Sequence, residues 1–521
     1  MDKGKICEEL LTPVSILALS GMENEERLLT DHGPCVPFKS ANSAKFVGKG
    51  SYVCLDFGRE IAGSIRIISS FLKGGDRLHI RLGESASEAL APLGTKGACN
   101  DHSPRDIEVD IASMSDLTFC RSGFRFAYIE SLGDNPLLIQ NIYAVLRTEK
   151  FSREGYIKTN DEEINRILET AAYTMKLCCQ NGYIWDGIKR DRLVWAGDLH
   201  QEVLTSGYLF GDIENTPNSL TFLKNDTADG AWMNWIPSYS AWWVINLCEY
   251  RRLTGNTAFF NKNAGYAKSI IKRINKLTGK DGSMNYAEGK KNYFLDWPTR
   301  GTDDEIPGTA AIMMIAAEKL FNYTEDKNCA ELVNKLSVWL SAPCTAKQTK
   351  AMQVLAGAQP DAAEFIENGG AHGFSTFMSY YILSAYAMCG GTKVTELIKE
   401  YFGAMLSRGA TTFWEDFNLD WLEGSGRIDE IPNDDVKDLH GDYGAFCYKG
   451  FRHSLCHGWS SGVYSFFVEK VLGVKIEDGK VISVTPNTFG LTEIEAEIPV
   501  ADGILKVKIK DGKKRHYIKK I

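Results

Sequence analysis

Apolar and polar side chains alternate along much of the first 150 residues. The segments 64–67, 77–82, 106–111 and 124–129 place apolar residues at every second position. A period of two predicts half-buried antiparallel strands. Several short strands of this kind, separated by turns, are typical of a β-sandwich. We therefore expect an N-terminal β-sandwich domain over residues 1–150.

The pattern changes to a helical period near residue 159. A candidate capping residue and three acidic residues over 159–163 precede apolar positions spaced three and four apart over 164–175. This arrangement predicts the start of a long helix. Further helical periods cover 238–252, 308–321, 328–341, 374–388, 395–407 and 456–471. Many helices with long loops, and no alternation of strand and helix, favour a helical barrel or toroid over a parallel sheet. We expect this helical domain to span residues 151–471.

A strand period returns after residue 472. Apolar residues alternate over 480–484 and 505–509. Asp511-Gly512 follows the second of these segments and predicts a two-residue hairpin turn. The chain is therefore expected to end in a small β domain over residues 472–521.

Composition and charge exclude several classes of protein. The 521 residues carry a formal net charge of −8, which disfavours a nucleic-acid binder because such proteins present a basic surface. The 13 cysteines show no Cys-x-x-Cys pair, which fits free thiols in a reducing compartment. The apolar stretch after Glu9 lacks a basic leader and contains Pro13, so it is a poor signal peptide. No run reaches the roughly 18 apolar residues of a membrane span. We expect a cytoplasmic protein without nucleic-acid or membrane partners.

Two clusters combine charged and aromatic residues. Residues 185–198 hold three carboxylates, three basic residues and two tryptophans, which is hard to explain as core. Residues 409–421 alternate acids with large aromatics. Aromatic faces bind the apolar side of a sugar ring and carboxylates bind its hydroxyls, so this mixture predicts a carbohydrate pocket. Any one aromatic is also compatible with the core, and Tyr239 and Trp243 share a face of one predicted helix. Further aromatic and acidic residues between the clusters are Trp232, Trp235, Trp242, Asp296 and Trp297.

Glycoside hydrolysis requires two carboxyl groups. One protonates the leaving oxygen and the other activates water, at a separation of about 6.5–9.5 Å in inverting enzymes. The first cluster offers candidate acids and the second a candidate base. His453 and His457 flank Cys456, but no third ligand completes a metal set and no serine elbow surrounds a nucleophile. We therefore expect no metal and no cofactor, and a role for His457 in orienting a sugar hydroxyl or the attacking water.

At these clusters the chain resembles the α-L-rhamnosidases of glycoside hydrolase family 78. The family signature reads roughly Asp-Cys-Pro-x-Arg-Glu-Arg-x-x-Trp-x-Gly-Asp. It is matched here at Asp186, Arg190, Arg192, Trp195, Gly197 and Asp198. Residues 410–415 resemble the family's Ala-Thr-Thr-x-Trp-Glu element, and 454–457 its Ser-Leu-x-His element. Residues 55–60 and 82–85 are similar to segments of its N-terminal β domain, so the resemblance covers about residues 50 to 521.

The resemblance implies an (α/α)6 barrel that carries the active site between a β-sandwich and a small β domain. It also implies metal-independent, inverting removal of terminal α-L-rhamnose, with Glu415 as the general base. Asp186 and Asp198 would bind rhamnose hydroxyls, and Arg190, Trp195 and Trp243 would shape the pocket. The pattern of acids and aromatics adds Asp296 and Trp297 to the expected substrate-binding residues.

One departure from the family concerns the general acid. The family has Glu where this chain has Asp191, whose side chain is one methylene shorter. Burial can raise a carboxyl pKa enough for an acid role, so we predict Asp191 as the acid, with Asp198 as the alternative. Gly187 and Ile188 also replace the Cys-Pro of the signature.

The sequence therefore predicts an exo-acting α-L-rhamnosidase for small or oligosaccharide rhamnosides of plant origin. Two alternatives stay open: a related helical-barrel glycosidase that acts on another deoxy sugar, and a catalytically impaired rhamnose-binding protein. A homodimer is compatible with such an enzyme, and nothing in the sequence demonstrates one.

Overall fold

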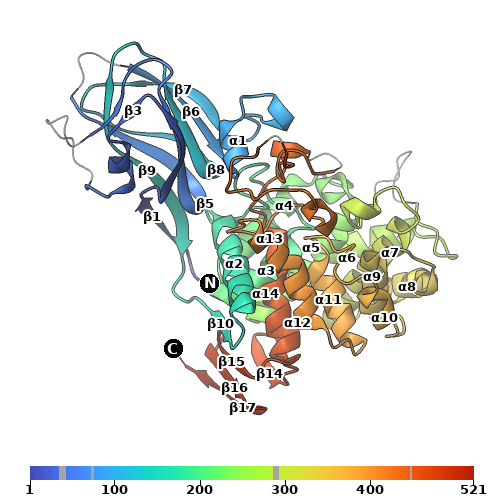
Figure 1. Cartoon of the computed structure of the whole chain (residues 1–521). Coiled ribbons are helices and arrows are strands. Elements are labelled where there is room, and N and C mark those ends of the chain that lie inside the picture. The colour runs from blue at the N-terminus through green and yellow to red at the C-terminus, as the bar shows by residue number, and fades with distance from the viewer. Residues whose placement is uncertain (34–42, 72–75, 286–292, 434, 446–448, 521) are drawn as a thin grey trace.

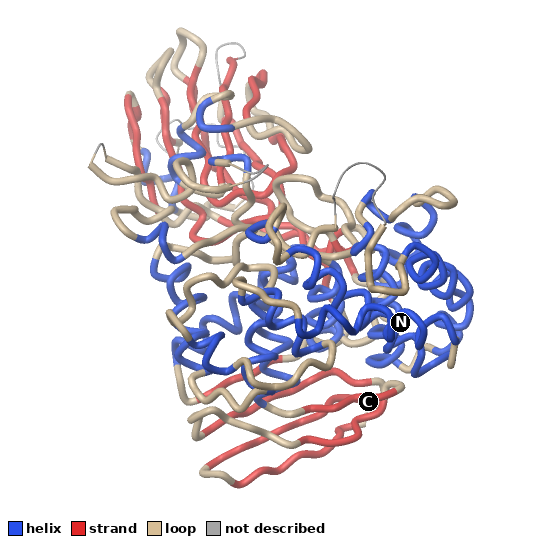
Figure 2. The backbone as a smooth tube through the Cα atoms, turned by 90° about the vertical axis from the view of Figure 1, so that its right-hand side faces the viewer, coloured by secondary structure: helices blue, strands red, loops and turns tan. Residues whose placement is uncertain are grey.

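The computed structural model describes residues 1–33, 43–71, 76–285, 293–433, 435–445 and 449–520. A β-rich N-terminal region lies at one end of the molecule, a helical region in the middle, and a smaller sheet at the other end (Figures 1 and 2). The predicted order of strand, helix and strand along the chain is therefore confirmed at this coarse level.

The N-terminal region is a nine-stranded antiparallel sheet in the order β3-β4-β9-β5-β8-β6-β7, with β1 paired to β9 and β2 to β5. All four segments with strand period lie in strands. Register shifts interrupt the pairing of β5 with β8 after Asp56, where the two longest strands bend. The strands are β1 (Lys5–Leu11), β2 (Ser15–Ser20), β3 (Met22–Glu23), β4 (Ala44–Phe46), β5 (Tyr52–Ser69), β6 (Asp76–Gly83), β7 (Asp106–Ile111), β8 (Asp116–Ser131) and β9 (Leu137–Lys150). A short helix, α1 (Ala86–Leu90), follows β6.

The helical region begins where the sequence predicts it. Asp161 caps α2 (Glu162–Cys178), because its side chain accepts a hydrogen bond from the Ile164 amide at 3.1 Å. Six helices contact one another in the closed order α3, α5, α7, α9, α11, α14 and back to α3. The helices α2, α4, α6, α8, α10 and α12 each contact a member of this ring.

The predicted helices agree with the structure to different degrees. The periods 238–252 and 308–321 lie inside α5 (Pro237–Thr254) and α7 (Glu305–Thr324). The period 328–341 becomes α8 (Lys327–Leu336) and a 3-10 turn, and 395–407 runs through α12 (Val394–Ile398), a π-turn and α13 (Ala404–Ser407). The other helices are α3 (Leu199–Phe210), α4 (Asn215–Asp226), α6 (Thr257–Leu277), α9 (Lys347–Leu355), α10 (Ala363–Glu367), α11 (Ser379–Met388) and α14 (Gly462–Phe466).

Two predicted helix starts are wrong. The helix expected at 374 begins only at Ser379, since Ser375 and Thr376 direct their hydroxyls to Asp296 and to the Glu415 carbonyl instead. The helix expected at 456 begins with a 3-10 turn at Gly458, because the His457 amide bonds the Phe413 carbonyl. Both of these helix starts lie beside the candidate active site.

The C-terminal sheet has four strands in the order β10-β15-β16-β17. Asp511 and Gly512 form the predicted hairpin turn, with φ of 48° and 74° as a type I′ turn requires. β10 comes from the beginning of the helical region and pairs with β15 from the end of the chain. The strands are β10 (Tyr156–Thr159), β15 (Glu493–Val500), β16 (Gly503–Lys510) and β17 (Lys513–Lys519), beside a separate hairpin of β13 (Val474–Glu477) and β14 (Lys480–Val484).

Polar contacts fasten the N-terminal sheet onto the helical region. The Arg125 guanidinium binds both carboxylate oxygens of Asp56 at 2.8 Å and donates to the Gly409 carbonyl at 2.9 Å. The Glu60 amide donates to Thr411 Oγ1 at 2.9 Å. These contacts place strands β5 and β8 against the second motif cluster. Separately, the described part of the chain contains no helix whose length and hydropathy would allow it to cross a bilayer.

Candidate active site

A cavity of about 150 Å³ lies where the two motif clusters meet. Both clusters and the 454–457 segment contribute to its wall, although the first cluster lies more than 200 residues before the other two segments. Its lining residues are Asp186, Asp191, Trp195, Asp198, Ile236, Tyr239, Phe294, Trp297, Arg300, Glu415, His457 and Trp459. The structure thus brings most of the predicted site residues together.

Asp186 is fixed by the backbone of its own loop. Its Oδ1 accepts a hydrogen bond from the Leu193 amide at 2.9 Å, and its amide donates to the Leu193 carbonyl at the same distance. The Gly458 amide donates to the Asp186 carbonyl at 2.7 Å. Burial raises the pKa of Asp186 well above its ordinary value, and repulsion from Asp191 and Asp198 adds to the shift.

Asp198 lies at the start of α3. The Tyr239 hydroxyl donates to Asp198 Oδ1 at 3.1 Å. Burial raises the pKa of Asp198 to about 8. Asp198 therefore holds its proton at pH 7. A neutral carboxyl both donates and accepts hydrogen bonds, as a sugar hydroxyl requires. The preceding Gly197 leaves room for this pair, because a Cβ there would lie 2.5 Å from the Tyr239 ring.

Glu415 is held by groups from two elements. The Ser454 amide donates to Glu415 Oε2 at 2.9 Å, and Arg190 Nη2 binds Oε1. Arg190 Nη1 also donates to Asp191 Oδ1 at 2.8 Å. Arg190 therefore bridges a carboxyl group of each motif cluster. A carboxylate that is held in one orientation is suited to act as a base.

His457 points into the group of carboxyls. Its Nε2 lies 3.9 Å from Asp186 Oδ2, 3.8 Å from Asp198 Oδ2 and 3.9 Å from Glu415 Oε1. Burial lowers the pKa of His457 well below its ordinary value, and the charge of Arg190 adds to this, so the ring is neutral. The ring contacts Trp459, with centroids 4.3 Å apart. A neutral imidazole here can hydrogen-bond a ligand without adding charge.

Asp191 is the most exposed of the four acids in the cavity. Its side chain is 10% exposed, against 3% for Asp186, 5% for Asp198 and 2% for Glu415. It therefore lies towards the mouth, while the other three lie deeper. His102, from the loop between α1 and β7, places Nε2 3.5 Å from Asp191 Oδ1.

Aromatic rings form the remaining walls. Trp195 meets Tyr239 edge-on, and Phe294 meets Trp297 edge-on at 4.9 Å. The buried Nε1 of Trp195 has no hydrogen-bond partner among the described residues. Arg300 lies over the Trp297 ring at 5.1 Å. Rings with a few inward polar groups are the usual composition of a sugar pocket.

Asp296 stands behind this wall. Its Oδ2 accepts from Ser375 Oγ at 2.5 Å and its Oδ1 from the Trp297 amide at 2.8 Å. Burial raises the pKa of Asp296 to about 6. The structure therefore places Asp296 where it orients Trp297, without lining the cavity.

Trp243 does not reach the cavity, which corrects the expectation that it shapes the pocket. It is fully buried, donates from Nε1 to the Leu220 carbonyl at 3.0 Å and meets Tyr266 edge-on. Tyr239, one turn earlier on α5, does line the cavity. Trp243 thus anchors α4 and α6 to α5 in the core.

Sequence reasoning missed Ile236 and Arg300 as lining residues. Arg300 follows the predicted Asp296-Trp297 pair by a few positions, so extending that motif would have found it. His102 gave no local signal, because only the packing of the N-terminal region on the helical region brings it to Asp191.

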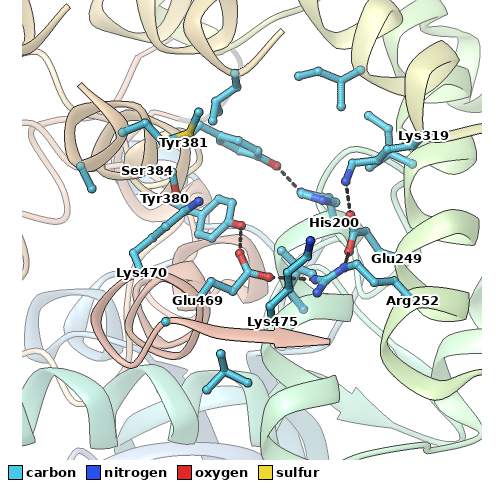
Figure 3. A pocket seen from close by; sticks show the side chains of 18 of the residues that line it. His200, Glu249, Arg252, Lys319, Tyr380, Tyr381, Ser384, Glu469, Lys470 and Lys475 are labelled. Carbon is cyan, nitrogen blue, oxygen red and sulfur yellow. Dashed lines mark hydrogen bonds and ion pairs between the residues drawn. The ribbon is translucent and has the colours of Figure 1, made fainter. Parts of the chain in front are cut away.

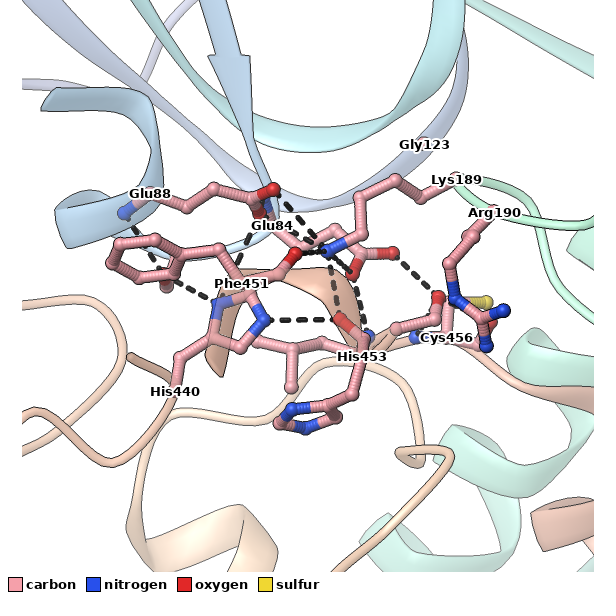
Figure 4. A network of polar contacts seen from close by, with 12 residues as sticks. Glu84, Glu88, Gly123, Lys189, Arg190, His440, Phe451, His453 and Cys456 are labelled. Atoms are coloured by element: carbon pink, nitrogen blue, oxygen red, sulfur yellow. Dashed lines mark hydrogen bonds and ion pairs between the residues drawn. The ribbon is translucent and has the colours of Figure 1, made fainter. Parts of the chain in front are cut away.

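A buried ion cluster supports the site from the N-terminal side (Figure 4). Lys189 Nζ lies 3.0 Å from Glu84 Oε2 and 3.2 Å from Glu88 Oε1, and donates to the carbonyls of Phe451 and His453. Glu84 accepts from the Leu455 amide at 2.6 Å and from Ser454 Oγ at 3.0 Å. Since Ser454 binds Glu415, this cluster holds the segment that positions the predicted base.

Glu84, Glu88 and His440 have the types and spacing of a metal-ligand set. The sequence gave no sign of it, because its members come from distant segments. The Lys189 ammonium already supplies a positive charge to both carboxylates.

A second, larger cavity of about 550 Å³ lies between the helices and the β13–β14 hairpin (Figure 3). Four of its charged groups form a network: Glu249 binds Lys319 and Arg252, and Glu469 binds Arg252 at 2.8 Å and the Tyr380 hydroxyl at 2.6 Å. None of the predicted site residues lines it. We therefore assign the candidate active site to the smaller, acidic cavity.

Comparison with protein families gives one match. Residues 152–341 match the model of the bacterial α-L-rhamnosidase six-hairpin glycosidase domain. This segment contains the first motif cluster and ends before Glu415. Among curated proteins, no sequence matches the chain.

Solved structures share the fold over most of the chain. A family 78 rhamnosidase of Bacillus sp. GL1 has a TM-score of 0.68 at 20% identity, over 88% of this chain and 50% of that one. A rhamnosidase of Klebsiella oxytoca with rhamnose bound has 0.70 at 17%, over 89% and 96%. A Streptomyces avermitilis α-L-rhamnosidase in complex with L-rhamnose has 0.63 at 14%, over 98% and 48%. The chain spans half the length of the Bacillus enzyme. The match over residues 152–341 and the shared fold thus confirm the resemblance to the bacterial α-L-rhamnosidases that the motifs predict.

Proposed function

We propose that the protein is an exo-acting glycoside hydrolase that removes terminal α-L-rhamnose with inversion of configuration. The observation that carries this proposal is a cavity of about 150 Å³ that holds four carboxyl groups, of which Glu415 is buried against Arg190 and Asp191 lies at the mouth. A cavity of this size suits one sugar ring. Room for one ring is what the removal of a terminal sugar requires.

Glu415 is the proposed base. Arg190 and the Ser454 amide hold its carboxylate in place, so that it can remove a proton from the water that attacks the anomeric carbon. Asp186, Asp198, His457 and Trp195 are proposed to bind the sugar hydroxyls. Trp297 is proposed as the apolar wall for the ring, with Asp296 behind it.

Asp191 is the proposed acid. In an exo-acting enzyme the leaving group points out of the cavity, so the proton donor must stand near the mouth, as Asp191 does. One observation favours Asp198 as a second candidate, since its pKa of about 8 keeps its proton at neutral pH. Its deeper position favours hydroxyl binding instead.

The decisive test measures hydrolysis of para-nitrophenyl α-L-rhamnopyranoside beside other para-nitrophenyl glycosides. We expect activity on the rhamnoside, with the β-anomer of rhamnose as the first product seen by NMR. Preference for another deoxy sugar, or binding of rhamnose without turnover, would support the alternative functions. Glu415→Gln should lower kcat by at least about a thousandfold and retain rhamnose binding by calorimetry.

The dependence of kcat on the leaving group identifies which residue is the general acid. Asp191→Asn should lower kcat strongly on an alkyl rhamnoside and little on a nitrophenyl rhamnoside, whose leaving group needs no proton. Asp198→Asn should raise KM for both substrates. If the two variants behave the other way round, Asp198 is the acid.

The finer architecture is part of the same proposal. The closed contact order of six helices, each flanked by an outer neighbour, supports an (α/α)6 barrel. We propose the domain limits 1–150, 151–471 and 472–521. A small-molecule or oligosaccharide rhamnoside as the ligand, a metal-free reaction, a cytoplasmic location and a homodimer stay predictions from the sequence.

A further inference from the structure

His102 is the N-terminal region's contribution to the mouth of the cavity. Its Nε2 lies 3.5 Å from Asp191 Oδ1, and its side chain is 30% exposed. Neighbouring residues dock the same loop: Ser103 Oγ donates to the Lys189 carbonyl at 2.8 Å, and Asp101 pairs with Arg452 at 2.8 Å. The loop is therefore fastened to the segment that carries the proposed acid.

Backbone strain marks this contact. His102, Asp191 and Arg192 all have positive φ, at 67°, 52° and 56°. Non-glycine residues adopt this region at a conformational cost and are often found at functional sites. The backbone on both sides of the contact therefore holds an unfavourable conformation.

The two oxygens of Asp191 differ in their contacts. Arg190 Nη1 and His102 Nε2 both approach Oδ1. Within the described residues, no hydrogen bond reaches Oδ2. Oδ1 is therefore the fixed oxygen, and Oδ2 is left to carry the proton.

We propose that His102 is a positioning residue for Asp191, which compensates for the missing methylene of the acid. The Nε2–H of His102 holds Oδ1, so that the Oδ2–H bond points at the glycosidic oxygen. That proton passes to the oxygen as the bond to the anomeric carbon breaks and its electron pair stays on the oxygen. The Asp191 carboxylate then regains a proton from solvent. This inference rests on the proposed function and on Asp191 as its acid.

The test compares kcat and KM on an alkyl and a nitrophenyl α-L-rhamnoside. His102→Ala should lower kcat on the alkyl substrate about tenfold, the upper end for the loss of one hydrogen bond, with less than about a twofold change on the nitrophenyl substrate and in KM. His102→Gln should retain most of the activity, because its amide can donate from the position of Nε2. In an Asp191→Asn background, His102→Ala should have no further effect.

His79 provides a matched control. It belongs to the same region, is 23% exposed, and its Nε2 contacts Asp106 Oδ1 at 2.5 Å without lining the cavity. His79→Ala should leave the ratio of the two activities unchanged. Equal losses on both substrates, a full loss that persists without Asp191, or no loss at all would overturn the role of His102 while leaving the hydrolase proposal intact. If the wild type cleaves neither rhamnoside, both proposals fail.

Discussion

Protonation is the central property of the residues deep in the cavity. Burial raises the pKa of Asp186 and of Asp198 because it penalises their charged forms, while Glu415 has the Arg190 guanidinium beside it. The three neighbouring acids thus divide into two whose burial favours the neutral form and one that lies against a cation. This division lets the cavity hold several carboxyls without an accumulation of negative charge.

The raised pKa of Asp198 makes stability depend on pH. The folded state holds a proton up to pH about 8, whereas the unfolded chain releases it near its ordinary pKa of 3.8. The stabilisation is therefore complete below pH about 4 and is lost as pH rises towards 8. Asp198→Asn keeps a neutral side chain at every pH. We expect its Tm to fall between pH 5.5 and 8.5 by at least about 2 °C less than that of the wild type.

Scanning calorimetry at the two pH values measures this difference. Asp442→Asn is the control, because the Asp442 side chain is partly exposed, pairs with Lys96 and lies outside the cavity. Parallel Tm curves for Asp198→Asn and the wild type would show that Asp198 is ionised in the folded protein.

The segments that carry the site residues are held in place by contacts with other parts of the chain. The segment 186–191 rests on the Lys189 cluster, and the same cluster holds the Ser454 segment through Glu84. When one partner of a buried ion pair is removed, the other charge stays buried without compensation, and the free energy of unfolding falls strongly.

Lys189→Met should therefore destabilise the protein by about 3–5 kcal/mol, since it leaves Glu84 buried without its cation and Glu88 with Arg105 alone. The midpoint of urea unfolding measures this loss. Lys508→Met, at a pair with Glu495 that is more than half exposed, should cost about 0–1 kcal/mol. Equal midpoints for the two variants would contradict a supporting role for the cluster.

The spacing of apolar residues predicted those strands and helices that have one buried face and one exposed face. The strands β5 to β8 and the helix α2 follow from their periods, and the amphipathic α6 could have been predicted in the same way. α3 is buried on nearly every side, so its sequence has no polar face to reveal a helical period.

The motif residues were predictable because they are close in sequence. Their distribution around the cavity was not, as Tyr239 and Trp243 show: they lie one turn apart on α5, yet only Tyr239 reaches the cavity. Which aromatic faces the site depends on how α4 and α6 pack on α5, and this tertiary contact leaves no mark on the local pattern.

At the scale of the whole molecule, the N-terminal sheet and the helical region share buried polar contacts. Arg125 joins Asp56 to the Gly409 carbonyl, and Glu84 joins the Leu455 amide. Separating the two regions would expose these groups without their partners, so each region stabilises the other.

We therefore expect the two regions to unfold in one transition. All 11 tryptophans lie between residues 185 and 459, so their fluorescence reports on the helical region alone, whereas far-UV circular dichroism also reports on the sheets. The two signals should give coincident urea transitions. A dichroism change that precedes the fluorescence change would show that the N-terminal sheet unfolds independently.

The pairing of β10 with β15 has a consequence for synthesis. The Tyr156 hydroxyl bonds Glu495, 339 residues later in the chain. At about 5–20 residues per second, a ribosome needs roughly 20–70 s to make the second partner after the first. During that interval the backbone edge of β10 and the side chain of Ile157, buried in the finished protein, have no cover. The nascent chain thus carries an open strand edge throughout that interval.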